Sequence, residues 1–331
     1  MCKNIYLIIP LIFILHSIFY SKSLQMKLMI SIIIVNYNTE RLLEDCLSSI
    51  FEKTQAVDFE IIVIDNNSEE GSLDKLISKY KSVKFHFAGL NLGFGKANNL
   101  GATLATGKYL FFLNPDTLLI NNAVNILFHY MESHPETGIC GGNMYKGDMT
   151  PASSLYNTDF LTYEYKIIFN IKRTPGFNYS KVPQNVLVIV GADLFIRKDV
   201  FDEVNGFDPD FFMYFEEVDL CYRTRKAGHA VTSVPDAQII HLQGGSAENK
   251  SEDLGKWSYN EHWYSKYLFF YKTKGLLQTK MINYIYRLKL NLAMMYFKFS
   301  GNSHKIEYWR AKELVIQTAY NRLLNYIHKN I

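Results

Sequence analysis

The chain has 331 residues, of which 48% are hydrophobic and 20% are charged, and its formal net charge is +3. This composition is typical of a globular protein and excludes a disordered one, while the small net charge gives no support for nucleic-acid binding. The length allows one large α/β domain with an appendage, or two medium domains. The four cysteines (Cys2, Cys46, Cys140 and Cys221) show no Cys-x-x-Cys pair and no zinc-type spacing with histidine, so we expect buried thiols in a reducing compartment.

Residues 5–20, IYLIIPLIFILHSIFY, form an apolar segment that follows Lys3. As a helix this segment would span about 24 Å, less than the hydrocarbon core of a bilayer at about 30 Å. Two interpretations stay open: a signal-like membrane anchor, or an over-extended gene start, because the sequence from Met26 resembles the natural beginning of a cytosolic enzyme. The segment lacks a clear small-x-small cleavage site, which disfavours a cleaved secretory peptide.

From Met29 on, short apolar runs alternate with helical patterns. Residues 30–36 are a continuous apolar run, typical of a strand buried on both faces, and further strands are predicted at 59–65, 83–88 and 108–114. Helical spacing follows the first strand, and the helix after the third strand is expected to end at Gly107 as its C-cap. A further helix is expected through about His134. This alternation predicts a mostly parallel sheet flanked by helices, which binds ligands beyond the carboxyl ends of its strands.

Polar residues end three of these strands. They are Asn36 and Asn38 after the first, Asp65, Asn66 and Asn67 after the second, and Asn114 and Asp116 after the fourth. Turn and capping preferences explain any one of these sites, but three at one sheet edge favour a binding site. Asp116 and the Asn114 amide can hold a divalent cation through oxygen ligands, with a diphosphate completing the shell, although Asn-Pro-Asp is also a common turn.

After about residue 145 the alternation ends. Residues 146–185 have weak periodicity and suit a long excursion or lid, and residues 186–197 are strand-like. A short helix stopped by Gly206 follows, and then a helix from about Phe215 that is capped by Gly228.

The segment 211–223, FFMYFEEVDLCYR, places three carboxylates among aromatic side chains. Burying them is costly unless they are paired or catalytic. Glu216 or Glu217 could serve as a general base whose pKa is raised by burial, although the helix N-terminus opposes that shift. The alternative is that both glutamates favour the helix dipole while Asp219 pairs with Arg223 at i, i+4. We favour pairing for Asp219 and catalysis for Glu217.

The tail beyond about residue 256 mixes aromatic residues with lysines. Basic, aromatic helices can lie in a membrane interface, or they can pack on the sheet and leave their lysines in water. Both interpretations stay open.

Taken in order, SIIIVNYN, EIIVIDNNS, NLGFGKANNLG, FFLNPD, GADLFIRKDVFDEVNGFDPDFFMYFEEVDLCYR and HLQGGS resemble a family 2 glycosyltransferase, and more narrowly the rhamnosyltransferase-like branch of bacterial surface-polysaccharide biosynthesis. The likeness covers about residues 29–275. It implies an α/β GT-A fold, a nucleotide-sugar donor, a divalent metal (Mn²⁺ or Mg²⁺) and inversion at the anomeric carbon. We therefore expect an apolar segment at 1–25, a GT-A catalytic domain at 26–250, and a helical, basic and aromatic tail at 251–331 that associates with membranes on one of the two interpretations above.

The resemblance implies two groups of donor contacts. The nucleoside pocket would be lined by Asn36, Asn38 and Asp65. The donor would also be faced by Asn91, Gly93, Lys96 and Asn99, with Lys96 best placed for phosphate.

It also implies the metal site and the acceptor side. Asp116 matches the metal-binding acid of the family's DxD-like motif, Asn114 stands in place of its first acid, and His241 matches a histidine that approaches the metal or is structural. Glu217 stands where the family often has the Asp of a Glu-Asp pair, so the base is Glu216 or Glu217. The acceptor sugar would be bordered by Phe212, Tyr214 and Asp219.

The leading hypothesis is inverting, metal-dependent transfer from a nucleotide sugar, with dTDP-rhamnose as one candidate, to a glycan on a polyprenyl carrier. A catalytically silent scaffold of the same fold is the alternative, motivated by Asn114 and Glu217 in place of aspartates. Nucleotidyl transfer and dinucleotide binding are disfavoured, because no glycine-rich phosphate loop follows the first strand. Since nucleotide sugars are cytosolic, we expect the protein at the cytoplasmic face of the inner membrane.

Overall fold

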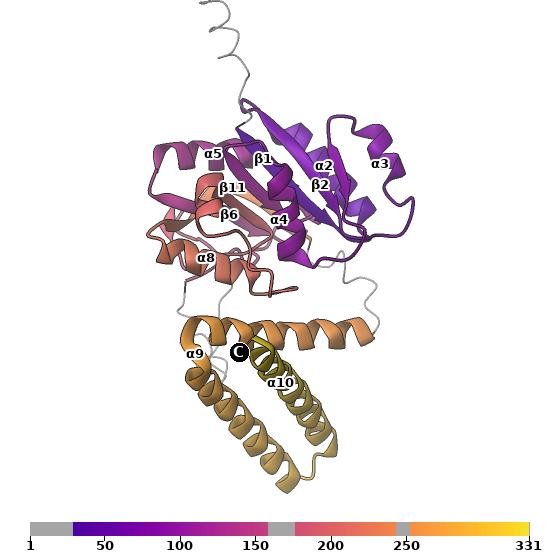
Figure 1. Cartoon of the computed structure of the whole chain (residues 1–331), viewed down its shortest axis with the longest axis vertical. Coiled ribbons are helices and arrows are strands. Elements are labelled where there is room, and N and C mark those ends of the chain that lie inside the picture. Colours follow the sequence, from indigo (N-terminus) through magenta and orange to yellow (C-terminus); the bar gives the residue numbers. More distant parts are fainter. Residues whose placement is uncertain (1–28, 158–175, 243–251, 331) are drawn as a thin grey trace, which may run out of the picture.

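The computed structural model describes residues 29–157, 176–242 and 252–330. A sheet flanked by helices forms one part of the molecule, and two long helices, α9 and α10, form the other (Figure 1). The predictions for residues 1–25, and for residues 158–175 of the expected excursion, lie outside the described residues.

The first half of the sheet is parallel, as predicted. It contains, in spatial order, β3 (Lys84–Phe87), β2 (Phe59–Asp65), β1 (Ile30–Asn36) and β4 (Tyr109–Leu113). The register pairs Asn36 with Asp65, so the polar ends of β1 and β2 lie at the same edge. In β4 every residue is buried, which fits a strand covered on both faces.

The second half of the sheet is mixed. Its strands are β5 (Thr117–Leu119), β6 (Thr137–Tyr145), β8 (Gln184–Asn185), β10 (Asp193–Arg197) and β11 (Ala230–His241). Strand β10 runs antiparallel to both β4 and β6, and β11 runs parallel to β6. A separate pair joins β7 (Leu155–Tyr156) and β9 (Val188–Ile189). The pattern missed β5 inside an expected helix, because three residues are too few to show a period.

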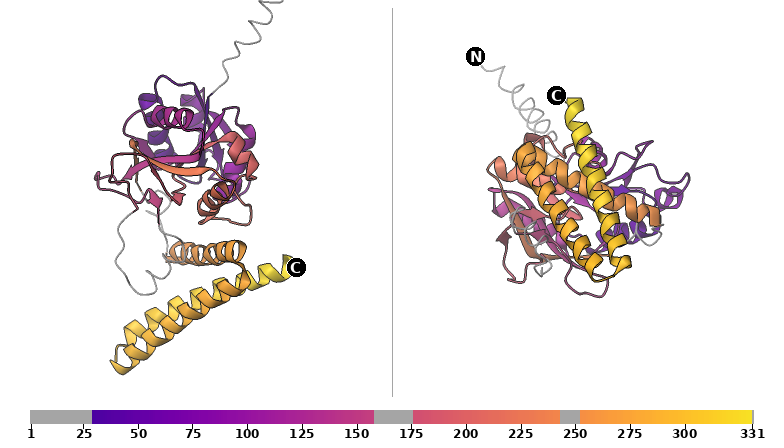
Figure 2. Two further views of the ribbon diagram at one scale, coloured as in Figure 1. Left: turned by 90° about the vertical axis from the view of Figure 1, so that its left-hand side faces the viewer. Right: turned by 90° about the horizontal axis from the view of Figure 1, so that it is seen from below.

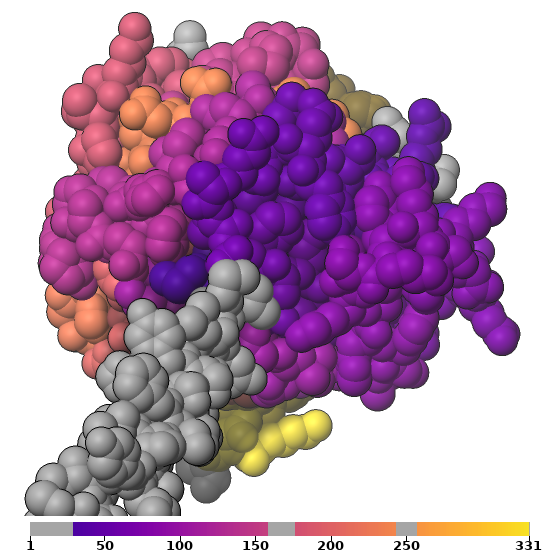
Figure 3. Space-filling view, turned by 90° about the horizontal axis from the view of Figure 1, so that it is seen from above, coloured from indigo at the N-terminus to yellow at the C-terminus, as the bar shows by residue number. Residues whose placement is uncertain are grey.

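Helices cover both faces of the sheet. One face packs against α2 (Glu40–Lys53), α3 (Asp74–Lys79) and α5 (Ala123–Ser133). The other packs against α4 (Phe94–Leu104), α7 (Lys198–Glu203) and α8 (Glu216–Lys226). Neighbouring residues of β1 divide between the two faces, as the two-residue repeat of a strand requires. In the space-filling view from above, the indigo and purple surface of the earlier residues adjoins the magenta to orange surface of residues further along the chain (Figure 3).

The tail is helical, as predicted. Helix α9 (Glu252–Phe299) breaks at Gly275, whose φ is 82° and ψ 171°, and α10 (Ser303–Asn330) follows. The first segment of α9 lies beside the part of the molecule that contains the sheet, and the second segment with α10 forms a hairpin that extends away from it (Figures 1 and 2). The predicted domain boundary at residue 250 stays a prediction. Among residues 29–157, 176–242 and 252–330, no helix is both long and apolar enough to cross a membrane.

One predicted helix end is wrong and another is confirmed. Helix α4 ends at Leu104, with Ala105 as an extended C-cap, so Gly107 is not the cap. A Cβ at Gly107 would lie 2.6 Å from the Ser31 backbone nitrogen, so the glycine allows close approach of the chain to β1. Helix α8 ends as predicted, and Gly228 follows it with a φ of 97°.

Candidate active site

The ends of β1 and β2 are joined by side-chain hydrogen bonds. Asn36 Nδ2 donates to Asp65 Oδ1 at 3.1 Å and to Ser68 Oγ at 3.0 Å. The Ser68 backbone nitrogen donates to Asp65 Oδ2 at 3.1 Å, and both Asn36 and Asp65 are buried. Asn38 has a φ of 53° and accepts a hydrogen bond from the Glu69 nitrogen at 2.9 Å. The structure therefore brings these three predicted residues together in one rigid corner.

Asn66, at the end of β2, holds the loop that carries Asn91 and Gly93. Its Nδ2 donates to Asn91 Oδ1 at 3.0 Å, and its Oδ1 accepts from the Leu92 nitrogen at 2.8 Å. The Gly93 nitrogen donates to Asn91 Oδ1 at 3.0 Å. The sequence placed Asn66 at the strand end but did not single it out, because its partners lie about 25 residues further along the chain.

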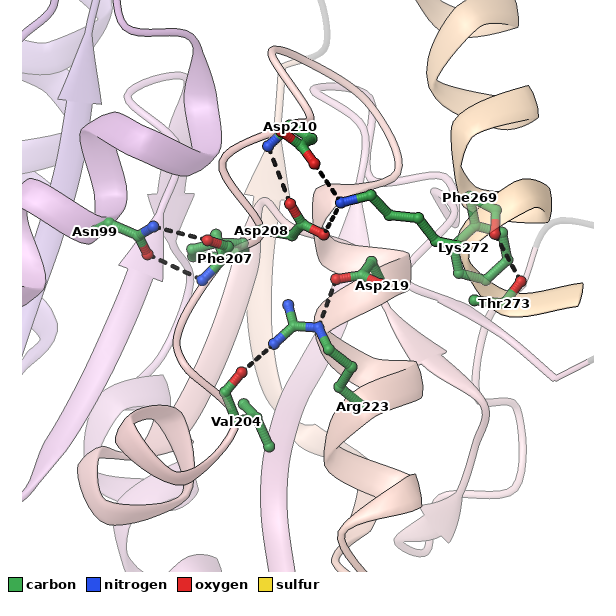
Figure 4. A network of polar contacts seen from close by, with 10 residues as sticks. All are labelled: Asn99, Val204, Phe207, Asp208, Asp210, Asp219, Arg223, Phe269, Lys272 and Thr273. Carbon is green, nitrogen blue, oxygen red and sulfur yellow. Dashed lines mark hydrogen bonds and ion pairs between the residues drawn. The ribbon is translucent and has the colours of Figure 1, made fainter. Parts of the chain in front are cut away.

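Helix α4 carries Lys96 and Asn99, which were predicted to face the donor. Both polar atoms of the Asn99 amide bond to the Phe207 backbone, Nδ2 to the oxygen at 2.8 Å and Oδ1 to the nitrogen at 2.9 Å (Figure 4). The Asn99 side chain thus fixes the loop before α8, instead of presenting a free amide. Lys96 is exposed, and its phosphate-binding role stays a prediction.

Asp116 and His241 lie side by side because β5 and β11 pair antiparallel, with His241 opposite Thr117. His241 Nε2 is 3.2 Å from Asp116 Oδ1, and the two side chains are only 14% and 13% exposed. Within the described part of the chain, His241 Nδ1 and Asn114 Oδ1 are buried without a hydrogen-bond partner. The structure therefore brings Asp116 and His241 together, and their role as metal ligands stays a prediction.

This donor set fits a hard or borderline divalent cation. Neighbouring ligands of an octahedral ion with bonds of about 2.1 Å are about 3 Å apart, close to the separation of the Asp116 and His241 atoms. A carboxylate, an imidazole and an amide oxygen without a partner suit Mn²⁺ or Mg²⁺. Among the described residues no group of three His, Cys, Asp or Glu side chains is placed to hold a metal. Such an ion would therefore need further oxygen ligands from a bound diphosphate or water.

Glu216 and Glu217 begin α8 after a strained turn. Tyr214 and Phe215 have φ values of 69° and 70°, in the left-handed region that such side chains rarely adopt. Backbone strain of this kind is concentrated at functional sites, where the surrounding structure enforces it. The turn directs the first turn of α8 into the body of the protein, and Glu216 is buried.

Residues 190–193 connect Glu217 to the metal-binding candidates. A Cβ at Gly191 would lie 3.4 Å from Glu217 Cβ, so the Glu217 side chain packs on this glycine. The next residue, Ala192, accepts a hydrogen bond from the Asn114 nitrogen at 3.1 Å. The strand end that carries Asn114 and the start of α8 thus both contact one short segment.

The two glutamates differ in their surroundings. Glu216 packs against α4, 3.6 Å from the Cβ position of Gly95, and its buried Oε2 has no hydrogen-bond partner among the described residues. Burial raises the pKa of Glu216 well above its ordinary value, and the charge of Glu217 adds to the effect. Burial also raises the pKa of Glu217, although the backbone N–H groups of Glu217 and Val218 oppose the shift. Both carboxyl groups therefore hold their protons to a higher pH than an exposed glutamate does.

Two of the predicted acceptor-side residues, Phe212 and Tyr214, pack against the first segment of α9. The Phe212 ring meets Trp257 edge to face at 5.9 Å, and Tyr214 Oη bonds to Ser258 Oγ at 2.5 Å. Asp219 is 3% exposed and receives Arg223 Nε at 2.6 Å, which confirms the i, i+4 pair weighed from the sequence. This pair engages the Asp219 carboxylate inside the protein.

An ion-pair cluster ties α9 to the loop before α8 (Figure 4). Lys272 Nζ lies 2.5 Å from Asp208 Oδ2 and 2.5 Å from Asp210 Oδ2, and Tyr326 Oη of α10 donates to Asp210 at 2.5 Å. Burial alone would lower the pKa of Lys272, but the two carboxylates raise it. No local pattern predicts this cluster, because Lys272 and Tyr326 lie more than 60 residues from the aspartates that they contact.

The sheet has a parallel half with polar strand ends and a mixed half that brings Asp116 and His241 to the same edge. This architecture is a fold of the GT-A type. The family model of glycosyl transferase family 2 matches residues 31–204, more than half of the chain, and the chain therefore belongs to this family. The resemblance inferred from the motifs is thus confirmed.

The similar proteins include two bacterial rhamnosyltransferases. Rhamnosyltransferase WbbL of Escherichia coli (strain K12) is 29% identical over 237 residues, which cover 64% of this chain and 83% of that protein. N-acetylglucosaminyl-diphospho-decaprenol L-rhamnosyltransferase of Mycobacterium tuberculosis (strain ATCC 25618 / H37Rv) is 25% identical over 246 residues, covering 65% of this chain and 76% of that protein. This chain is rhamnosyltransferase-like.

A crystal structure of GalNAc-T7 with UDP, GalNAc and Mn²⁺ resembles this fold, with a TM-score of 0.53 and 18% identity. The match covers 73% of this chain and 48% of that structure, so this chain spans about half the length of that protein. At this identity the likeness shows the fold alone.

Proposed function

We propose that this chain is an inverting, metal-dependent glycosyltransferase of cell-surface polysaccharide synthesis. It would move a sugar from a nucleotide-sugar donor to a glycan on a polyprenyl diphosphate. The two rhamnosyltransferase relatives support L-rhamnose as the sugar, and one of them is named for a decaprenol-linked acceptor. The observations that support the proposal are the close approach of Asp116 and His241, and the contacts of Glu217 and of Asn114 with neighbouring residues of segment 190–193.

The donor side is proposed at the carboxyl ends of the parallel strands. Asn36 and Asp65 hold one another in place and would contact the nucleoside, with Asn38 at the same corner. The loop at Asn91 and Gly93, fixed by Asn66, would form the neighbouring wall. Lys96 is exposed on α4 and would supply a positive charge to the diphosphate.

The metal site is proposed at Asp116 and His241, with Asn114 Oδ1 as a further oxygen. A bound Mn²⁺ or Mg²⁺ supplies positive charge that stabilises the departing nucleoside diphosphate. The burial of Asp116 and His241 excludes most water from this charge, which makes it more effective than it would be in solution.

The chemical step is proposed to use Glu217 as general base. Its carboxylate accepts the proton of the attacking acceptor hydroxyl, whose oxygen then forms the new bond to the anomeric carbon. The bond from that carbon to the diphosphate oxygen breaks, and its electron pair leaves with the diphosphate. Because attack and departure occur on opposite faces, the product is inverted. Glu217 is preferred to Glu216 because its side chain packs on Gly191, next to the residue that bonds to Asn114.

The remaining assignments concern the acceptor and the location. Phe212 and Tyr214 would border the acceptor sugar, since flat apolar rings stack on sugar faces and exclude water. Because nucleotide sugars are cytosolic, the catalytic domain, proposed at residues 26–250, would work at the cytoplasmic face of the inner membrane.

The test is a donor panel assayed for sugar release and for transfer to a polyprenyl-diphosphate-linked acceptor, with and without EDTA. We expect dTDP-rhamnose to be turned over, EDTA to abolish turnover, and Mn²⁺ or Mg²⁺ to restore it. Asp116→Asn should lose metal-dependent turnover, whereas Asp58→Asn, an exposed carboxylate that precedes β2 at the opposite edge of the sheet from the site, should match the wild type. Absence of metal-sensitive turnover for every donor would contradict the proposal.

A catalytically silent sugar-nucleotide-binding protein is the second candidate, favoured by Asn114 and Glu217 in place of the family's aspartates. It predicts that nucleoside diphosphate binds, that Glu217→Gln binds equally well by calorimetry, and that the wild type releases no sugar. The donor panel therefore separates the two functions.

A further inference from the structure

The second segment of α9, residues 276–299, carries a row of exposed apolar side chains. Its members recur at intervals of four and three residues and are between 45% and 87% exposed: Leu277, Met281, Tyr284, Leu288, Leu292, Met295 and Phe299. We call this row the exposed stripe. Buried residues of the same segment, such as Ile282, Tyr286 and Leu290, share a core with α10. At 100° per residue the exposed stripe lies nearly opposite that buried row, so the hairpin leaves it uncovered.

The charged side chains on the helix segment that carries the exposed stripe are all basic. Between Glu261 and Glu307 the chain contains no Asp or Glu, but it contains eight Lys or Arg residues. Three of these, Lys280, Arg287 and Lys298, follow one flank of the exposed stripe at helical spacing. A helix face that is apolar along its centre and cationic along its edge is complementary to a partner with an apolar interior and an outer layer of negative charge.

This charge pattern disfavours a second copy of the chain as the partner. Heptad-like spacing can form a coiled-coil seam, but coiled coils pair opposite charges beside that seam. Here a symmetric pair would bring cationic flanks together with no carboxylate on the segment to neutralise them. Like charges at such positions repel.

We propose that the exposed stripe lies in the interface of a bilayer that contains anionic lipids, with its flanking cations at the headgroups. Amphipathic helices with Lys and Arg on the polar edge and large apolar side chains on the other face bind in this way. The segment is about 36 Å long, so it would lie along the membrane plane, and the break at Gly275 lets it leave the direction of the first segment (Figure 1). This interaction goes beyond the proposed transfer reaction and needs no donor or acceptor.

The same helix also supports the acceptor side of the site. On the other side of Gly275, α9 holds Phe212 and Tyr214 through Trp257 and Ser258. A lipid-bound second segment would therefore hold this face near the surface where a polyprenyl-linked acceptor is presented. This consequence, unlike the binding itself, rests on the proposed function.

The experiment places an environment-sensitive fluorophore (NBD) on the full-length chain, in a Cys2→Ser background, at Leu292→Cys. The matched control is Val182→Cys, which is 56% exposed on the catalytic body, compared with 57% for Leu292. Vesicles of phosphatidylcholine with about 30% phosphatidylglycerol, similar in sign to a cytoplasmic leaflet, are added to each. We expect a severalfold rise and a blue shift in emission for the label at position 292, and no change at position 182.

Two further comparisons make the result decisive. Replacing Arg287 and Lys298 by Gln should weaken vesicle binding about thirty-fold, because each cation near an anionic surface contributes about 1 kcal/mol, a factor of about five. Vesicles of phosphatidylcholine alone should bind less well. A label at position 292 that stays in water while the protein sediments with vesicles would show attachment elsewhere and overturn the proposal. A label at position 292 that is already shielded from water without vesicles would also overturn the proposal. Shielding that depends on protein concentration would show a protein partner on the exposed stripe, and shielding that does not would show another part of the chain there.

Discussion

Gly93 lies where the loop that carries Asn91 meets the loop before α8. Its φ is 78°, and a Cβ there would lie 2.1 Å from the Phe212 backbone oxygen. The same oxygen accepts a hydrogen bond from the Phe94 nitrogen at 2.9 Å, so the two loops are already in direct contact. Replacing Gly93 by Ala should therefore force the start of α4 away from Phe212.

The expected cost has two parts. With a φ of 78° and a ψ of −175°, Gly93 occupies a backbone region that is essentially restricted to glycine, and a side chain there costs about 1–2 kcal/mol. The 2.1 Å contact must open by about 1 Å to reach an ordinary carbon–oxygen separation, which breaks the Phe94–Phe212 hydrogen bond and loosens the packing around it, for about 2–3 kcal/mol more. We expect Gly93→Ala to lower the free energy of unfolding by about 3–5 kcal/mol.

Gly89→Ala is the matched control. Its φ of 74° is nearly the same, but its Cβ would meet nothing within 4 Å among the described residues. This variant should lose only the backbone contribution of about 1–2 kcal/mol. Urea unfolding measures the free energy of unfolding of both variants. Transfer assays at a temperature where both are folded should show a lower kcat for Gly93→Ala alone, since Phe212 precedes the strained turn that leads to Glu217. Equal losses of stability, within about 0.5 kcal/mol, would refute the contact argument.

Three further outcomes are expected. Lys272→Met should lower stability by about 2–4 kcal/mol and reduce kcat/KM, because it leaves Asp208 and Asp210 without their cation, while Lys272→Arg restores much of both. Glu216→Gln should raise the free energy of unfolding at pH 8 by about 1–3 kcal/mol. The reason is that a carboxyl whose pKa is raised in the folded state stabilises the fold below its ordinary pKa, and this contribution is lost as the pH rises through the raised value. The stability gained by Glu216→Gln should therefore vanish near pH 4 in urea titrations. The rate of transfer should fall on the acid side at a pH above the ordinary glutamate range, because burial raises the pKa of Glu217 and a general base must be ionised; a limb at or below that range would contradict this role.

The parallel half of the fold was predictable because its information is local. The continuous apolar runs that became β1, β2 and β4 could only be strands buried on both faces, and parallel strands place their carboxyl ends at one edge. The mixed half was not predictable in the same way. The three residues of β5 carry no period, and the pairing that brings His241 to Asp116 depends on strands more than 100 residues apart.

The candidate site was predictable to the same extent. The paired Asn36 and Asp65 follow from strand ends, whereas the attachment of Asn99 to Phe207 and of Lys272 to Asp208 needs the folded chain. An amide or a lysine in a sequence gives its chemistry but not its partner. The i, i+4 partner of Asp219 was predictable because helical spacing alone sets that distance.

The most direct test of the account compares the transfer rate of Glu217→Gln with its affinity for the donor nucleoside diphosphate in one preparation, beside Glu216→Gln. The account predicts that Glu217→Gln loses about 10²–10⁴ in kcat with an unchanged Kd for the diphosphate, while Glu216→Gln stays within about tenfold of the wild-type rate. A Glu217→Gln enzyme that transfers sugar at the wild-type rate would contradict the assignment of the base, and with it the proposed arrangement of base and metal site around residues 190–193.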